Sequence, residues 1–517
     1  MSATRVADGL ETTPFRLSRV GRQALVYGAG ILLSKAAAFV MLPVYTRYLT
    51  TTDYGVLDLI NVTLIEATTV FAGASLVIGI FRFYHKAEGP DERQALLSTA
   101  LLLLSASYAI LAGCIFVMAP QLSTLLFGSS GKTTLLRIAS GSLAWEGFIL
   151  VPLAYLRIRE RSQLFVIAQS AKLALQLGLN LVFLIPFGMG AQGMLLSGLL
   201  ANCVLAPVLL GYLLREVPFR PSRQAARQLL GFGVPLITTQ MAMFIVTYAD
   251  RYFLQAAAGS AAVGLYALSY QFGFLLFTLA DLPFSMVWGP LRFEVAKRPD
   301  RDRIYARCFV YLSVVLMTLG AMLALFARDF LRVMAAPAFL HAADIVPLLL
   351  AAYAFHAWAK FQSIGILVRE RTWFIAFADW SAAIVAFVCY WLWIPPLLGF
   401  GAALATLAAF AVRWAIVYSV SQWLWPVRYQ WRGVVQLAGV VGVVVAVGLL
   451  LPGETLVESV GARLVMFAVL GVALWRLPLF SDEERALLRR ARSEPRVVLG
   501  KLIGRPQAGA RDDRDER

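Results

Sequence analysis

The chain has 517 residues, of which 60% are hydrophobic and 15% are charged, and its formal net charge is +16. A soluble protein of this length would carry about 25% charged residues, so the low charge and the mean hydropathy of +0.73 exclude a soluble enzyme. The basic residues fall in short loops between apolar stretches instead of on one soluble face, which argues against nucleic acid as a partner.

Apolar stretches long enough to cross a bilayer recur along the chain, and we predict about 14 membrane-spanning helices. Their centres lie near residues 35, 68, 107, 146, 174 and 202, then near 240, 273, 316, 354, 384 and 411, and finally near 442 and 468. The expected divisions are a cytosolic segment (1–22), a first lobe (23–214), a cytosolic linker (215–230), a second lobe (231–426), an extra helix pair (427–480) and a basic, amphipathic to disordered cytosolic tail (481–517). The predicted fold class is therefore an all-α polytopic membrane protein with two six-helix lobes and two C-terminal helices.

An internal repeat supports the division into two lobes. The triplet Arg-Glu-Arg occurs at 159–161 and again at 369–371, a shift of 210 residues. Phe81-Arg82-Phe83 returns as Leu291-Arg292-Phe293 with the same shift. Duplicated halves in a membrane protein usually form two bundles that rock about a central site, as transporters do.

The loops between the predicted spans alternate in charge, which predicts the orientation of the chain. Every second loop is basic, whereas the intervening loops 185–190 and 394–399 carry no charge. Lysine and arginine are retained on the cytoplasmic side of membranes, so we expect a multi-pass protein of the bacterial inner membrane with both termini in the cytoplasm.

Ionisable and polar side chains inside the predicted spans are the candidate site residues, because charge at bilayer depth is costly unless it faces a cavity or a partner. Gln169, Lys172, Gln176 and Asn180 are three, four and four residues apart and would form a stripe on one helix face. A cationic cavity for an anionic substrate is predicted from six residues: Lys35, Lys172, Lys360, Gln169, Gln176 and Asn180. Candidate ion-coupling groups are Glu66, Glu146, Asp281, His356 and Asp379. The alternative for any single residue is a buried ion pair or a side chain that reaches the membrane interface.

Motif searches give no sign of a bound cofactor. The sequence contains neither a Walker-type glycine loop nor a zinc-binding motif, so no ATP and no metal site is expected. The possible exception is a proton or a sodium ion that couples transport to a gradient. The chain is therefore expected to be a secondary transporter and not an enzyme.

Two motifs resemble the polysaccharide-biosynthesis exporters, the Wzx-type oligosaccharide flippases within the multidrug/oligosaccharidyl-lipid/polysaccharide exporter (MOP) superfamily. The first is Leu-Pro-Val-Tyr-Thr-Arg-Tyr-Leu at 42–49, followed by Asp-Tyr-Gly-Val at 53–56. The second is Asp-Arg-Tyr-Phe-Leu at 250–254, followed by Gly-Leu-Tyr at 264–266. The resemblance extends over the first twelve predicted spans.

The resemblance implies a V-shaped transporter, similar to the multidrug and toxic-compound (MATE) exporters, that moves an undecaprenyl-diphosphate-linked glycan to the outer leaflet. It also implies a cationic cavity and a gate or lobe contact formed by Arg47, Asp250 and Arg251. The implied partners are the lipid-linked glycan, membrane lipid, and polysaccharide polymerase or export machinery.

Three alternatives remain open at the level of sequence. The first is a multidrug or metabolite cation antiporter of the same fold, against which the buried lysines argue. The second is a lipid II flippase, which shares the two additional helices. The third is a scaffold of a polysaccharide synthase complex that transports nothing.

Overall fold

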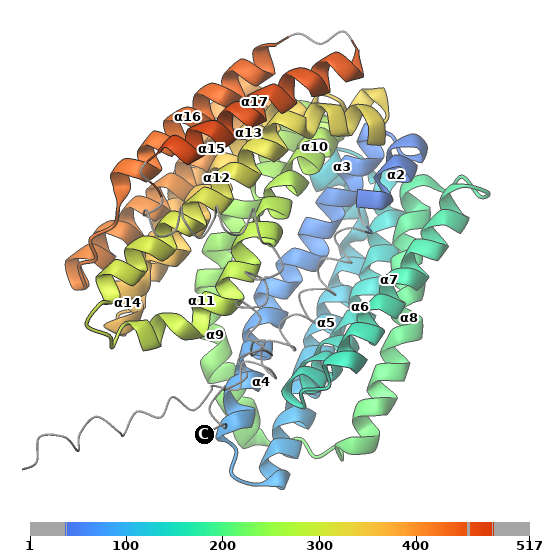
Figure 1. Ribbon diagram of the computed structural model, residues 1–517. Helices are drawn as coiled ribbons and strands as arrows, with labels where there is room; N and C mark the ends of the chain where they lie inside the picture. The colour runs from blue at the N-terminus through green and yellow to red at the C-terminus, as the bar shows by residue number, and fades with distance from the viewer. Residues whose placement is uncertain (1–36, 38, 452–454, 478, 480–517) are drawn as a thin grey trace, which may run out of the picture.

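The computed structural model describes residues 37, 39–451, 455–477 and 479, and these residues form a helical bundle without strands (Figure 1). The helices of its first half are α2 (Leu42–Tyr48), α3 (Thr51–Ile60), α4 (Ala74–Lys86), α5 (Pro90–Phe127), α6 (Thr133–Ile158), α7 (Ser162–Leu184) and α8 (Gly190–Glu216). Those of its second half are α9 (Arg223–Tyr248), α10 (Asp250–Leu276), α11 (Leu282–Val295), α12 (Arg301–Met334), α13 (Ala342–Gln362), α14 (Ile364–Val368) and α15 (Trp373–Leu424). The extra pair consists of α16 (Trp431–Leu450) and α17 (Leu456–Arg476).

Eleven helices in the described residues are long and apolar enough to cross a membrane, which confirms a multi-pass membrane protein. Two of them, of 67 and 52 residues, are far longer than the ~20 residues that one crossing needs. Each contains a residue with non-helical backbone angles, Gly259 in one and Leu398 in the other, so each is two spans joined by a tight turn. Most of the first expected span lies outside the described residues, and the count of 14 therefore stays a prediction.

Local sequence explains where the long helices begin and end. Thr50 and Asp53 form a reciprocal capping box at the start of α3, and Thr455 and Glu458 form the same box at α17. Helix α5 begins with Pro90 and acidic residues in its first turn, and it ends at Gly128, whose φ of 72° suits a glycine C-cap.

The repeated Arg-Glu-Arg triplet has a structural explanation. In both copies the central glutamate, Glu160 or Glu370, has a φ of 55°, which few residues other than glycine adopt. The amide of Arg161 donates to the carbonyl of Leu156, and the amide of Arg371 donates to Ile366 in the same way. This is the Schellman helix ending, so the duplicated triplet marks the same turn in each half.

A second feature common to both halves is a widened helical turn. Residues Thr69–Gly73 (η2) and Phe277–Asp281 (η4) are π-helical and occupy matching positions 208 residues apart. A further π-helical segment, Asn61–Glu66 (η1), precedes η2. Such turns often occur at functional sites, and two of the candidate carboxylates, Glu66 and Asp281, end such segments.

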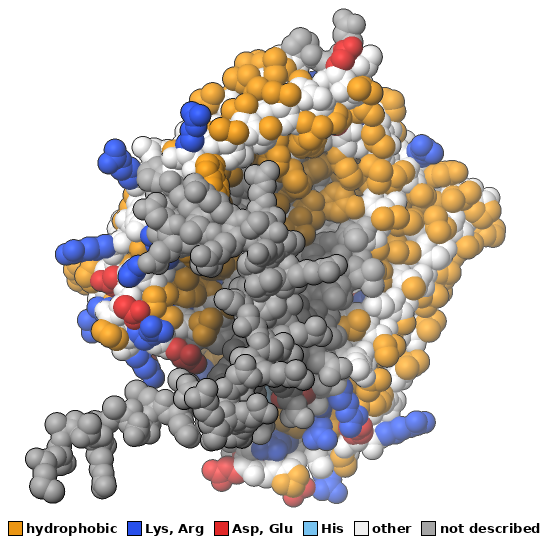
Figure 2. Space-filling model, in the orientation of Figure 1, with side chains coloured by type: hydrophobic (Ala, Val, Ile, Leu, Met, Phe, Trp, Pro, Cys, Tyr) orange, Lys and Arg blue, Asp and Glu red, His pale blue; other side chains and the backbone are white. Residues whose placement is uncertain are grey.

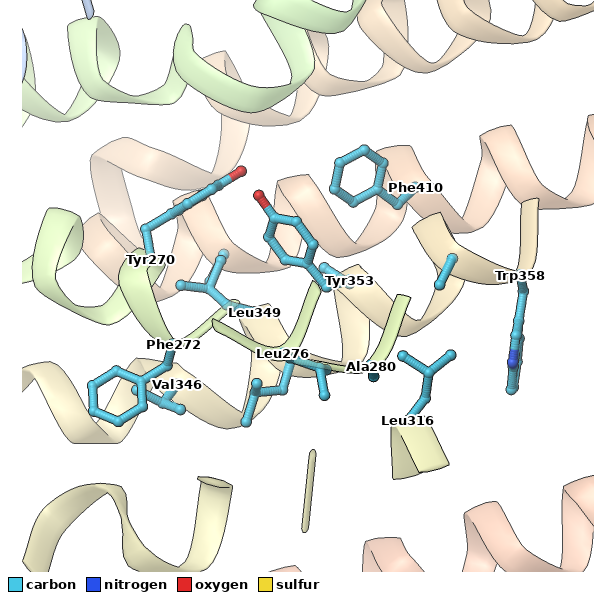
Figure 3. Close-up of a cluster of buried hydrophobic side chains, with 14 of the residues drawn as sticks. Tyr270, Phe272, Leu276, Ala280, Leu316, Val346, Leu349, Tyr353, Trp358 and Phe410 are labelled. Carbon is cyan, nitrogen blue, oxygen red and sulfur yellow. The ribbon is translucent and has the colours of Figure 1, made fainter. Parts of the chain in front are cut away.

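The two halves have largely separate hydrophobic cores. Buried residues of α4, α5, α6 and α8 cluster in the first half, together with Ala225 and Leu229 of α9. A larger cluster fills the second half, includes α16 and α17, and takes in Leu42 and Leu59 of the first half. The centre of the second cluster is aromatic: the rings of Tyr270, Tyr353 and Phe410 point toward one another (Figure 3). The centroids of Tyr270 and Tyr353 lie 5.9 Å apart at an interplanar angle of 83°, the edge-to-face geometry that aromatic pairs favour.

A buried ion pair fixes the extra helix pair to the second half. Arg463 of α17 pairs with Asp329 of α12, and Ser459 donates a hydrogen bond of 2.7 Å to the same carboxylate. Both charged side chains are at most 6% exposed. Neither residue was among the candidates from the sequence, because the pairing depends on the contact of α12 with α17.

The surface agrees with a membrane-embedded bundle. In Figure 2, hydrophobic side chains dominate the flank of the molecule, and charged side chains gather toward its lower and left margins. The lower end in Figure 1 is where α4 ends and α5 begins, next to one of the basic loops. We refer to this end as the basic end.

Candidate functional site

The two family-like motifs meet in space where α3 crosses α10, at the end of the bundle away from the basic end (Figure 1). A Cβ atom on Gly55 would overlap the carbonyl oxygen of Ser260, and one on Gly264 would overlap that of Thr51. Only glycine lets two backbones approach so closely. We call this contact the α3–α10 junction.

Polar groups bridge the same junction. The Tyr54 hydroxyl accepts a 2.8 Å hydrogen bond from the side-chain amide of Gln271, and the hydroxyls of Thr63 and Tyr252 lie 3.0 Å apart. Tyr54 also packs edge to face on Phe339. The residues of both motifs therefore hold the two halves together.

Arg251 is the central charged group of the junction. Its guanidinium donates to Asp58 of the first half at 2.8 Å and to Asp250 of its own half at 2.8 Å. Asp250 in turn accepts a 2.6 Å hydrogen bond from Tyr266. Arg251 is 2% exposed and Asp250 is fully buried. A forked guanidinium suits this arrangement because its N–H groups reach two carboxylates at once.

The predicted third member of the gate, Arg47, lies apart from these residues. Its side chain is exposed and forms no ion pair within the described part of the chain. The neighbouring Thr46 reaches the second half instead, where its hydroxyl accepts the backbone N–H of Ala336 at 3.1 Å.

A cavity of about 320 Å³ lies inside the first half, between α3, η1, α6, α7 and α8. Lys172 of α7 donates to Glu146 of α6 at 2.9 Å, and Asn202 of α8 donates to the same carboxylate oxygen at 3.0 Å. The remaining polar lining residues are Asn61, Ser142 and Gln176. We call this the first-half cavity.

The polar stripe predicted on α7 divides between different environments. Lys172 and Gln176 line the first-half cavity, whereas Gln169 is exposed. Asn180 is buried and donates to the Tyr45 hydroxyl at 2.8 Å.

The second half holds a matching pair. Lys360 of α13 donates to Asp281 at 2.6 Å, and the two residues line a different cavity from that of Lys172. Asp379 accepts a 2.6 Å hydrogen bond from Arg413. His356 lies among aromatic rings, with its centroid 4.8 Å from that of Phe410.

Charge at these sites is more balanced than the sequence suggested. Lys172 and Lys360 each have a carboxylate partner and line separate cavities. Lys35, the third predicted cation, lies outside the described residues. The predicted positive cavity therefore depends on residues beyond these two pairs.

Sequence reasoning overlooked two site residues, Asn202 and Arg292. Asn202 completes the Glu146 pair, but a lone asparagine in an apolar helix gave no spacing signal. Arg292 lines the Lys360 cavity, whereas the sequence places it in a repeated triplet at a basic loop and gives no sign of a site there.

The Lys172–Glu146 pair gives a prediction that separates folding from transport. The two side chains are 21% and 25% exposed, so Lys172→Ala should destabilise the protein by about 1–3 kcal/mol because Glu146 loses its cation. A neutral double variant, Lys172→Met with Glu146→Gln, should restore the folded yield measured by size-exclusion chromatography. If the double variant also restores full transport, the pair is structural only.

Comparison with known structures identifies the fold. The lipid II flippase MurJ in an inward closed conformation superposes with a TM-score of 0.71 over 87% of this chain and 99% of that chain, at 13% sequence identity. An inward-facing multidrug resistance transporter of the MATE family gives a TM-score of 0.55 over 78% of this chain and 94% of its own, at 16% identity. A MOP superfamily transporter from Pyrococcus furiosus also gives 0.55, over 78% and 95% of the two chains, at 15% identity. The fold is thus that of the MOP superfamily of transporters.

Residues 44–344 match the polysaccharide biosynthesis protein family. Because this match covers more than half of the chain, the protein belongs to that family. No curated protein matches the sequence. The predicted family is confirmed, and the likeness to MurJ and the MATE transporters shows a common fold.

Proposed function

We propose that this protein is a flippase that moves an undecaprenyl-diphosphate-linked oligosaccharide from the inner to the outer leaflet for polysaccharide biosynthesis. Membership of the polysaccharide biosynthesis family supports the glycan part of this proposal. The observation that carries the lipid-linked part is the extent of the likeness to MurJ, which reaches 87% of the chain against 78% for the MATE transporters. The difference is about as long as the extra pair α16 and α17.

The geometry supports alternating access between two rigid bundles. The largely separate cores favour movement of each half as a body, with α9 packed against α4 between them, and the α3–α10 junction closes the end away from the basic loops. A polar headgroup then enters from the basic end, and it leaves after the Asp58–Arg251 contact opens. The lipid tail stays in the bilayer, because only the charged headgroup needs a polar path across it.

Paired carboxylates are the proposed coupling groups. Glu146 and Asp281 each lie beside a lysine in a cavity, and Glu66 ends a π-helical segment. A carboxylate at bilayer depth exchanges a proton or a sodium ion as its surroundings alternate between wet and closed. Transport in liposomes should therefore respond to a pH or sodium gradient, and insensitivity to both would remove this coupling step.

A second candidate is a lipid II flippase, which the superposition on MurJ favours. Both substrates have a diphosphate on a long lipid, so they differ only in the glycan. The family match ranks the polysaccharide substrate first.

The test is a flipping assay with the full-length protein in liposomes. A fluorescent undecaprenyl-diphosphate-linked oligosaccharide is added to one leaflet, and its arrival in the other is followed with a membrane-impermeant quencher. We expect transfer well above that of protein-free liposomes and of the neutral Lys172–Glu146 double variant. Transfer of labelled lipid II alone would assign the second candidate, and transfer of a cationic drug alone would contradict both.

A further inference from the structure

A narrow cavity of about 130 Å³ lies between α11, α12 and α13, inside the second half. Its lining includes four residues that follow one another along η4 and α11 toward the basic end: Asp281, Ser285, Trp288 and Arg292. They are spaced four, three and four residues apart, which places them on one face of the helix. We call this cavity the α11 slot.

Two hydrogen-bond donors in the slot have no acceptor within the described residues. One is the indole Nε1–H of Trp288, a side chain that is only 7% exposed, and the other is Nε of Arg292. Buried donors are nearly always satisfied by protein, water or ligand. Two unsatisfied donors lining the same cavity therefore indicate an acceptor-rich occupant.

The charge of the slot also indicates an occupant rich in hydrogen-bond acceptors. Lys360 is neutralised by Asp281 at the deep end, whereas Arg292 has no acidic partner among the described residues. The slot thus carries one uncompensated positive charge beside the unsatisfied indole. A cation would be repelled there, and an anion would be held by charge-assisted hydrogen bonds.

The walls restrict the size and shape of the occupant. Trp288 stacks on Phe361 with centroids 5.4 Å apart and planes at 18°, which fixes the plane of the indole ring. The cavity volume of about 130 Å³ leaves room for a small anionic group. A tetrahedral phosphoryl group is small enough to enter this space.

We propose that the α11 slot is a binding site for a small oxyanion of the phosphate class, held by Arg292 and the indole N–H of Trp288. All of the residues that line the slot belong to the second half of the molecule. Two sources have the same chemistry: the diphosphate of a lipid-linked substrate and the phosphate headgroup of a membrane phospholipid. The inference does not require the proposed transport activity, because equilibrium binding tests it.

The first arm of the test uses a soluble probe. The full-length protein in a phosphate-free maltoside detergent is titrated with inorganic diphosphate by isothermal calorimetry. Trp288→Phe removes the N–H and keeps the aromatic wall, and Arg292→Gln removes the charge. Each should weaken binding by about tenfold or more, as expected for the loss of a hydrogen bond to a charged group.

The matched control is Arg298→Gln. Arg298 lies on the neighbouring basic loop, is exposed, and pairs with Asp300 at 2.9 Å, so its loss removes the same charge outside the slot. Binding by this variant should equal that of the wild type. An equal loss in Arg298→Gln, or unchanged binding in both slot variants, would overturn the proposal for diphosphate.

The second arm asks whether a phospholipid is the source. The same proteins are reconstituted into phosphatidylglycerol vesicles and extracted again in detergent. Native mass spectrometry then measures how much lipid stays bound to each protein. Retained lipid that Trp288→Phe and Arg292→Gln both lose, without diphosphate binding, supports the site with the headgroup as its ligand. If neither probe binds in a way that depends on Trp288 and Arg292, the proposal is wrong; unchanged melting temperatures show that the variants are folded.

Discussion

Gly264→Ala is expected to force the two halves apart at the α3–α10 junction. The added Cβ would overlap the carbonyl oxygen of Thr51, a backbone atom that cannot move independently of its helix. Overpacking of this kind costs about 1–3 kcal/mol. Here the strain acts between two bundles with separate cores, so the bundles should separate before either unfolds. The expected result is a population shift toward a state that is open at this end.

Spin labels at Arg47 and Ala256 would measure this shift, since both residues are exposed, lie on opposite halves, and are each four residues before a contact residue of the junction, Thr51 and Ser260. The four native cysteines would first be replaced. Gly211→Ala is the control, because its Cβ would meet nothing within 4 Å on α8. The steric argument fails if Gly264→Ala gives the same distance distribution as the control.

The sequence predicted the helices and the repeat because these depend on local patterns. Apolar length defines a span whatever its neighbours are, and the Arg-Glu-Arg triplet recurs because the same helix ending recurs in both halves. The two motifs were recognisable for a similar reason. Asp53, Gly55 and Gly264 each have a geometric role at the junction that few other residues can fill.

The partners of the charged residues could not be predicted in this way. Arg251 and Asp58 are 193 residues apart, and Lys360 and Asp281 are 79 apart, so only the packing of whole helices brings them together. The sequence therefore suggested isolated cations where the structure has ion pairs. The π-helical turn that ends at Asp281 had no sequence signal either, because an inserted residue leaves the apolar composition unchanged.

Three residues that the sequence did not single out also owe their roles to contacts between helices. The significance of Asp329 and Arg463 depends on the contact of α12 with α17, which the sequence does not show. In the sequence Trp288 cannot be told from an apolar core residue, because its significance depends on an indole N–H that has no acceptor in the part of the chain that the structure describes. An unsatisfied donor can be found only once the surrounding atoms are known.

Removal of Arg251 should have the largest effect on folding. Arg251→Ala leaves Asp250, which is fully buried, and Asp58 without their cation. Loss of one partner from a buried pair costs about 3–5 kcal/mol, and the contact of the guanidinium with the Tyr270 ring, 4.3 Å from its centroid, is lost as well. Little folded protein should therefore be recovered. Arg251→Lys should recover part of it, because an ammonium keeps the charge but cannot form the same fork.

Asp58→Asn separates the role of Arg251 in folding from its role between the halves. This change leaves Arg251 paired with Asp250 inside the second half, and Asp58 is 23% exposed, so the folded yield should stay close to that of the wild type. The bridge to the first half is weakened, and the labels at Arg47 and Ala256 should move apart as in Gly264→Ala. A double-mutant cycle between Asp58→Asn and Arg251→Lys should give a coupling energy of about 0.5–3 kcal/mol in unfolding measurements. Additive effects would mean that the bridge does not hold the halves together, and closure would then depend on the glycine contacts alone.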